Sequence, residues 1–147
     1  MLRRSAVGQV GLLDERFLIY GEDIDWCKRF NECGRKVVFF PDAEAIHYGG
    51  ASSSNAPVKF YLEMQRANYQ YWLKHHSRLI SYVFLFISLI HHLVRVVGEI
   101  VMYPFKRRER VASTHKIARC VACIKWIISA MAATSSKRRL QTAERLL

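Results

Sequence analysis

The chain lacks the features that would place its 147 residues in a secreted or disulfide-rich class. It has four cysteines, too few for the disulfide framework of a small secreted domain. No secretory signal is recognisable, because the basic start at Met1–Ser5 is not followed by an apolar segment before Asp14 and Glu15. Hydrophobic residues make up 51% of the chain, which excludes an intrinsically disordered protein. These observations predict one folded domain in a reducing, cytoplasmic compartment.

Acidic residues are scarce in the second part of the sequence. Residues 1–58 hold seven Lys/Arg and eight Asp/Glu, a net charge of −1. Residues 59–147 hold sixteen Lys/Arg and only four Asp/Glu, a net charge of +12. The near-neutral first part is typical of a packed segment. The basic and apolar second part is typical of a segment that meets an anionic surface, either lipid or nucleic acid.

The spacing of apolar residues predicts a short amphipathic helix over residues 22–33, with Ile24, Cys27 and Phe30 on one face. Three acidic residues fall in its first turn, where the helix dipole stabilises negative charge. Gly34 follows as a helix stop.

The segments around this helix predict other elements. Residues 1–20 indicate a short strand or turn and then a loop. The all-apolar run Val37–Phe40 predicts a buried strand, which ends at Pro41. A second helix is expected over residues 60–73.

Several motifs occur in an order that is informative as a set. They are Gly11-Leu12-Leu13-Asp14-Glu15, then Glu22-Asp23-Ile24-Asp25-Trp26-Cys27-Lys28-Arg29, then His47-Tyr48-Gly49-Gly50. This order resembles the second half of the catalytic domain in family 2 glycosyltransferases, and especially the rhamnosyltransferase-like enzymes of bacterial polysaccharide assembly. Those enzymes carry G-G-F-D-E and E-D-x-D-x-C-x-R segments and a His before a short Gly/Ser loop. The resemblance covers residues 3–55 well and residues 59–100 loosely.

The resemblance implies a partial α/β fold of the GT-A type, the fold of nucleotide-diphospho-sugar transferases, followed by a mostly helical tail. It also implies that Asp23 is the base that takes the proton from an acceptor hydroxyl in inverting sugar transfer. Glu22 is then expected to bind or orient the acceptor. The alternative is that the start of a helix simply favours acidic residues.

Three neighbours complete the expected acceptor-binding set. They are Asp25, Trp26 and Arg29. For each of them a structural role is the alternative. Asp25 can accept hydrogen bonds from nearby backbone or from Arg29, Trp26 can pack in the core, and Arg29 can form a salt bridge with a nearby acid.

A divalent metal, Mg or Mn, is expected for the complete enzyme. Asp23-Ile24-Asp25 spells the D-x-D pattern of such metal sites, but the family's metal-binding D-x-D ends an earlier strand, whereas this one opens a helix. His47 is the metal candidate, although its carboxylate partners are missing from this chain. The alternative for His47 is a strand-end side chain bonded to a carbonyl. The Gly/Ser stretch at 49–54 is either an acceptor loop or a plain surface turn.

The family's donor-binding half, which carries the nucleotide-diphosphate sugar, has no counterpart in the sequence. We therefore expect a fragment of an inverting glycosyltransferase that transfers a sugar, such as rhamnose, to a lipid-linked or polysaccharide hydroxyl. Such a fragment is expected to be inactive alone. Three parts are expected: residues 1–58 on the acceptor side, 59–110 with an apolar stretch at 79–105, and 111–147 as a basic amphipathic helix and tail.

The apolar stretch at 79–105 predicts association with the cytoplasmic face of the cell membrane. A spanning helix needs about 20 mainly apolar residues, and Arg95 and Glu99 interrupt this one. Basic residues flank it on both sides, which favours interfacial or re-entrant helices over a single span. Cys120 and Cys123 lack the second Cys/His pair of a zinc site and are expected to be apolar filler. The expected apolar stripe of the last helix is Ile117, Val121, Ile124, Ile128 and Met131.

Other classes of function stay open. One alternative is a non-catalytic, membrane-associated interaction fragment. Another is a nucleic-acid-binding module, suggested by the basic tail with Tyr69, Tyr71 and Trp72. The order of these aromatics before the basic clusters disfavours nucleic acid as a partner. A soluble helical core is the third reading, since mean hydropathy is only −0.01.

Overall fold

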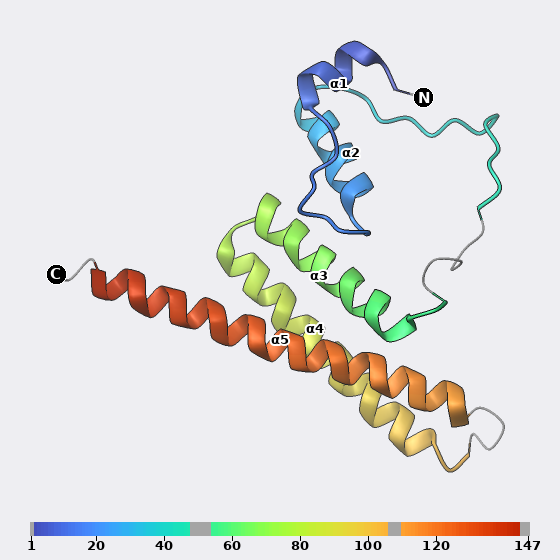
Figure 1. The fold of residues 1–147 in the computed structure, drawn as a ribbon, viewed down its shortest axis with the longest axis vertical. Helices are drawn as coiled ribbons and strands as arrows, with labels where there is room; N and C mark the ends of the chain where they lie inside the picture. The colour runs from blue at the N-terminus through green and yellow to red at the C-terminus, as the bar shows by residue number, and fades with distance from the viewer. Residues whose placement is uncertain (1, 48–53, 106–109, 145–147) are drawn as a thin grey trace. The chain divides into compact units, whose positions relative to one another are not determined.

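The computed structural model describes residues 2–47, 54–105 and 110–144, with side chains described up to residue 133. Five helices make up the regular structure of these residues (Figure 1). They are α1 (Arg4–Val10), α2 (Glu22–Glu32), α3 (Pro57–His75), α4 (Arg78–Met102) and α5 (Arg110–Glu144). The chain divides into two compact units, Met1–Tyr71 and Trp72–Leu147.

The expected α/β fold of the GT-A type is wrong, because the described residues contain helices and turns but no strand. The expected strand Val37–Phe40 is an irregular segment whose side chains are all exposed, Phe39 by 88%. A strand needs a paired neighbour for its backbone groups and a covering layer for its side chains. No described segment supplies either, so the apolar run has no sheet to join.

Helix α1 also differs from expectation, since residues 4–10 were expected to form a strand or turn. The segment Arg4–Val10 satisfies its own backbone hydrogen bonds as a helix and needs no strand partner. Its buried side chain is Ala6, and α1 packs against α2. The N-terminal part is therefore a small helical layer.

Helix α2 confirms the predicted helix, and its two ends have clear physical causes. Gly21 precedes it with a φ of 85°, a left-handed conformation that favours glycine. A Cβ at Gly21 would lie 3.3 Å from the Phe17 ring. At the other end, the Arg35 N–H donates to the Phe30 carbonyl at 2.8 Å, and Gly34 has a φ of 69°. This is a Schellman-type stop at the expected glycine.

Helix α3 confirms the second predicted helix and extends it on both sides, to Pro57–His75. Pro57 suits the first helical position, because its ring fixes φ and the missing N–H would have no helical partner there. Ala67 is buried and lies near Gly21, since a Cβ at Gly21 would be 3.7 Å from the Ala67 methyl. The start of α2 is thus packed against α3 within the first unit.

The second unit is a hairpin in which α4 and α5 lie side by side (Figure 1). Ser77 caps α4 by accepting a hydrogen bond from the Ile80 N–H at 3.4 Å. Leu85 of α4 and Ile127 of α5 are fully buried. The other buried side chains of the hairpin are small or polar: Ser81, Ser88, His92, Ser113, Cys120 and Cys123.

The stripe expected on the last helix is only partly correct. Its member Ile128 is 54% exposed, whereas Cys120, Cys123 and Ile127 are buried. Small side chains at Ser113, Cys120 and Cys123 let the two helices approach closely, and this decides which face of α5 is covered. The expectation that the two cysteines fill an apolar interior is confirmed, because both are at most 2% exposed.

Candidate active site

The three acidic residues at the start of α2 have different surroundings. Asp25 is fully buried, and its Oδ2 lies 2.9 Å from Nε of Arg29, one helical turn later. Asp23 is exposed, and its Oδ1 accepts a hydrogen bond from the Ile24 N–H at 2.8 Å. Glu22 is partly exposed, but its Oε2 atom is buried and has no hydrogen-bond partner among the described residues. A single turn therefore holds one structural acid and two acids with acceptor capacity to spare.

Arg29 and Trp26 hold the loop that precedes α2. Two guanidinium nitrogens of Arg29 donate to the carbonyls of Val10 and Leu12, at 2.8 and 2.7 Å. The indole N–H of Trp26 donates to the carbonyl between them, that of Gly11, at 2.9 Å. Three consecutive carbonyls are thus bound by two side chains of α2. We call this set of hydrogen bonds the loop clamp.

Asp25 completes the loop clamp from the other side. Its buried carboxylate holds the Arg29 guanidinium in place, and a buried charge is stable only when it is paired in this way. Gly11 lies in the clamp with a φ of 82°, a conformation that favours glycine. The clamp therefore fixes the backbone of Gly11, where the first motif begins, against α2. The only sequence signal for the loop clamp is the Asp25–Arg29 spacing of four, which predicts the ion pair but not the bonds to the loop carbonyls.

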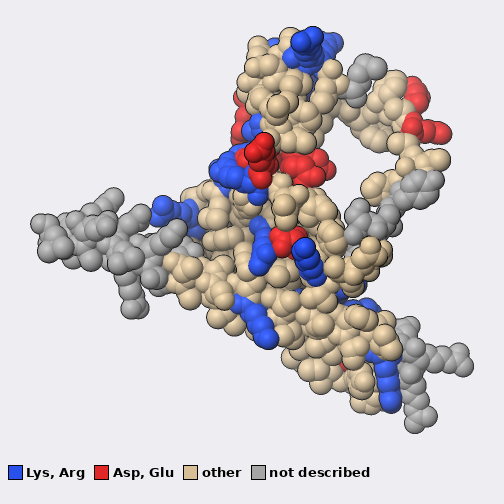
Figure 2. Space-filling view, viewed as in Figure 1, with Lys and Arg blue, Asp and Glu red and all other residues tan. Residues whose placement is uncertain are grey.

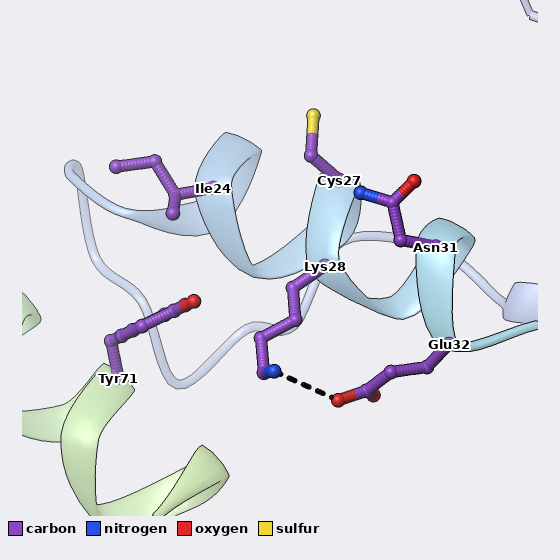
Figure 3. A pocket seen from close by; sticks show the side chains of 6 residues that line it. All are labelled: Ile24, Cys27, Lys28, Asn31, Glu32 and Tyr71. Atoms are coloured by element: carbon purple, nitrogen blue, oxygen red, sulfur yellow. Dashed lines mark ion pairs between the residues drawn. The ribbon is translucent and has the colours of Figure 1, made fainter. Parts of the chain in front are cut away.

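The opposite side of α2 carries an open depression of about 540 Å³ (Figure 3). It is lined by Ile24, Cys27, Lys28, Asn31, Glu32 and Tyr71. Lys28 and Glu32, one turn apart on α2, form an ion pair at 3.0 Å, and the hydrogen bond that the Lys28 ammonium donates to the Glu32 carboxylate raises the pKa of Lys28 (Figure 3). Glu22, Asp23 and Asp25 do not line this depression. The acids and the depression are therefore separate features of α2.

The metal candidate His47 lies in an irregular, exposed segment. The described residues contain no group of three or more His, Cys, Asp and Glu side chains that could hold a metal ion. They therefore offer no donor set for the expected Mg or Mn, and that cofactor stays a prediction for the complete enzyme. Of the Gly/Ser stretch, residues 49–53 lie outside the described residues.

Sequence comparison identifies one kind of relative. Over 77 residues the chain is 35% identical to the N-acetylglucosaminyl-diphospho-decaprenol L-rhamnosyltransferase of Mycobacterium tuberculosis, in strains CDC 1551 and H37Rv. The match covers 52% of this chain and 25% of the relatives, so the chain spans about a quarter of their length. No family model matches the chain, and no solved structure matches it. About half of the chain is thus related in sequence to a glycosyltransferase.

Proposed function

We propose that the chain supplies the acceptor-side part of an inverting glycosyltransferase of family 2. In this proposal a sugar passes from a nucleotide-diphosphate donor to a hydroxyl of a lipid-linked or polysaccharide acceptor. Rhamnose is the proposed sugar, by analogy with the relative's name. The observation that carries the proposal is the pair of available acids at the start of α2, the exposed Asp23 and the unsatisfied Oε2 of Glu22.

In the proposed reaction Asp23 is the general base. An acceptor hydroxyl donates its proton to a carboxylate oxygen of Asp23 as its own oxygen attacks the anomeric carbon of the donor sugar. The bond from that carbon to the diphosphate breaks, and the nucleotide diphosphate leaves with the bonding electrons. Oδ1 already accepts the Ile24 N–H, so Oδ2 is the oxygen proposed to take the proton.

Glu22 has the complementary role of binding the acceptor. A buried carboxylate oxygen without a hydrogen bond is costly, and a sugar hydroxyl that donates to Oε2 would remove that cost. In this proposal the acceptor-binding group and the general base are therefore adjacent residues on one helical turn. Both carboxylates lie in the first turn of α2, where helices favour acidic residues.

Asp25, Trp26 and Arg29 support the site in this account by holding the loop clamp. Direct acceptor contacts of these three side chains stay a prediction. The clamp favours catalysis because it keeps the start of α2 rigid, and a base misplaced by about 1 Å loses much of its effect.

Turnover requires a donor site and its metal in addition to these residues. The described residues gather no metal-binding set and contain no sheet that could cradle a nucleotide. We propose that a further polypeptide segment supplies the donor site and that residues 1–147 alone are inactive.

The test of the base is Asp23→Asn, introduced into the gene in its source cell. Membrane extracts are then assayed for transfer of labelled sugar from the nucleotide-diphosphate donor. Loss of a general base predicts a fall in rate of about 10²–10⁴-fold. The matched control is Asp42→Asn, which changes an exposed acid in a turn and should leave the rate unaltered. Asp23→Asn extracts that transfer sugar at the normal rate would refute the assignment.

A further inference from the structure

Helix α4 presents an unusually apolar outer surface. Twelve of its large hydrophobic side chains are exposed, and the described helix runs for 25 residues. The centre of this surface is formed by Val83, Phe86, Ile87, Ile90, Val94 and Val97, which are between 46% and 65% exposed. We call these six residues the α4 apolar face. Helix α4 is long and apolar enough to cross a membrane, and only 17% of its most apolar window is buried.

Three polar side chains of α4 are buried, whereas His91 and Arg95 are exposed. Ser81, Ser88 and His92 are buried in the hairpin. Further along, the Glu99 carboxylate accepts a hydrogen bond from the Ser113 hydroxyl at 2.7 Å and lies 3.7 Å from the Lys116 ammonium. The hairpin thus buries polar side chains beside Leu85 and Ile127, while large apolar side chains of α4 are exposed, an arrangement unusual for a soluble helix pair.

The outer side of α5 has a different character. Thr114, His115, Lys125 and Ser129 are exposed on it, together with the apolar Val111 and Ile128. Basic side chains dominate the charge of this unit, and Figure 2 shows Lys and Arg among the uncharged surface of the hairpin. The exposed surface of α4 is therefore more apolar than that of α5, although Arg95 is exposed on α4 and Val111 and Ile128 are exposed on α5.

We propose that the α4–α5 hairpin binds an anionic lipid bilayer and lies in its interface, with the α4 apolar face against the acyl chains and α5 toward water. An apolar surface with an opposite polar side is the pattern of interfacial helices. Arg78, Arg95 and Arg110 are exposed on the hairpin and complement anionic headgroups. This proposal does not depend on the transferase assignment.

A bilayer explains the α4 apolar face better than a protein partner. Protein interfaces carry about one hydrogen bond per 100–200 Å², and the six residues of this face offer no side-chain donor or acceptor. Hydrocarbon requires none. A helix pair that spans the bilayer fits less well, because α5 would then expose Lys125 and His115 to lipid.

The test is flotation of the full chain with vesicles of phosphatidylcholine and phosphatidylglycerol. The proposal predicts binding that persists at 1 M salt, where headgroup attraction is screened and apolar insertion is not. Ile87→Gln should reduce the partition coefficient about tenfold or more, since one buried apolar side chain contributes roughly that factor. Ile128→Gln is the matched control, the same change at a residue 54% exposed on α5 against 59% for Ile87, and should alter it less than twofold.

Three results would overturn the proposal. One is a chain that does not float with the vesicles and forms dimers in solution, which would assign the α4 apolar face to a second copy of the chain. Another is an equal fall in the partition coefficient for Ile87→Gln and Ile128→Gln while circular dichroism shows that both variants are folded. The third is binding that vanishes with salt and is replaced by nucleic-acid binding.

The orientation is tested separately with trypsin added outside intact vesicles. An in-plane hairpin leaves Arg110, at the start of α5, outside, so cleavage after Arg110 should match that seen after detergent is added. Protection at this site that only detergent removes would show that α4 crosses the bilayer, and the in-plane arrangement would be wrong.

Discussion

Asp25 and Arg29 lie one turn apart on α2, and both are committed to contacts inside the first unit. In the E-D-x-D-x-C-x-R motif they look like ligands for a substrate, yet burial and three hydrogen bonds of Arg29 give them a structural task. The spacing of four predicted their ion pair. The hydrogen bonds from Arg29 to the carbonyls of Val10 and Leu12 could not be predicted, because they depend on the loop conformation, which the residue types do not determine.

Arg29→Met should destabilise the first unit. It leaves the buried Asp25 carboxylate without its partner, and breaking a buried pair costs about 3–5 kcal/mol of unfolding free energy. Urea denaturation followed by tryptophan fluorescence, to which Trp26 of the first unit contributes, measures this. Lys28→Met is the matched control on the same helix, because its partner Glu32 is 55% exposed and such pairs contribute little. Equal losses in the two variants would contradict the loop clamp.

Gly21→Ala should also destabilise the first unit. A non-glycine residue at a φ of 85° costs about 1–3 kcal/mol, and the new Cβ would press on the Phe17 ring. Gly8→Ala is the control within α1, where a Cβ meets nothing within 4 Å, and it should stabilise the protein by about 0.5–1 kcal/mol. Thermal melts of both variants and of the wild type measure these changes in stability. An unchanged Gly21→Ala midpoint would mean that this turn is not constrained.

At the scale of elements, the sequence predicted a helix well where the residues that begin and end it are its neighbours in the sequence. The acids of the first turn and Gly34 set the bounds of α2 within the residues expected. The run Val37–Phe40 failed as a strand because a strand depends on partners elsewhere, and the described residues provide none. The buried side of α5 differs from the expected stripe for a similar reason, since packing against α4 covers the face that carries Ser113, Cys120 and Cys123.

The hairpin should lose stability in acid through His92. Burial, together with the neighbouring charges of His91 and Arg95, lowers the pKa of His92 to about 4, below its usual 6.5. The unfolded chain therefore binds the proton more readily. Stability is complete above pH 6.5 and declines as the pH falls from 6.5 through 4.

Thermal melts at pH 7, 5.5 and 4, followed by circular dichroism, measure this loss against a His92→Gln variant. The variant lacks the titrating group, so its midpoint should fall less between pH 7 and 4. Parallel decline of the two proteins would assign the acid sensitivity to other groups. His115, which is exposed on α5, provides a second control, since His115→Gln should follow the wild type.

At the scale of the whole molecule, the charge division of the sequence corresponds to two kinds of surface. The first unit carries the acids of α2, and the second carries the basic, apolar hairpin. A transferase that works on a lipid-linked acceptor would need both, one to activate a hydroxyl and one to stay at the membrane. The expected three-part division of the chain and the cytoplasmic side of the membrane stay predictions.

The most direct test of the central claim is the mass of the lipid-linked sugars in the source cell that carries Asp23→Asn. The account predicts that the acceptor accumulates without the transferred sugar, while cells with Asp42→Asn keep the normal product. A normal product in Asp23→Asn cells, with the variant protein present at its usual level, would contradict Asp23 as the base and with it the proposed transferase site.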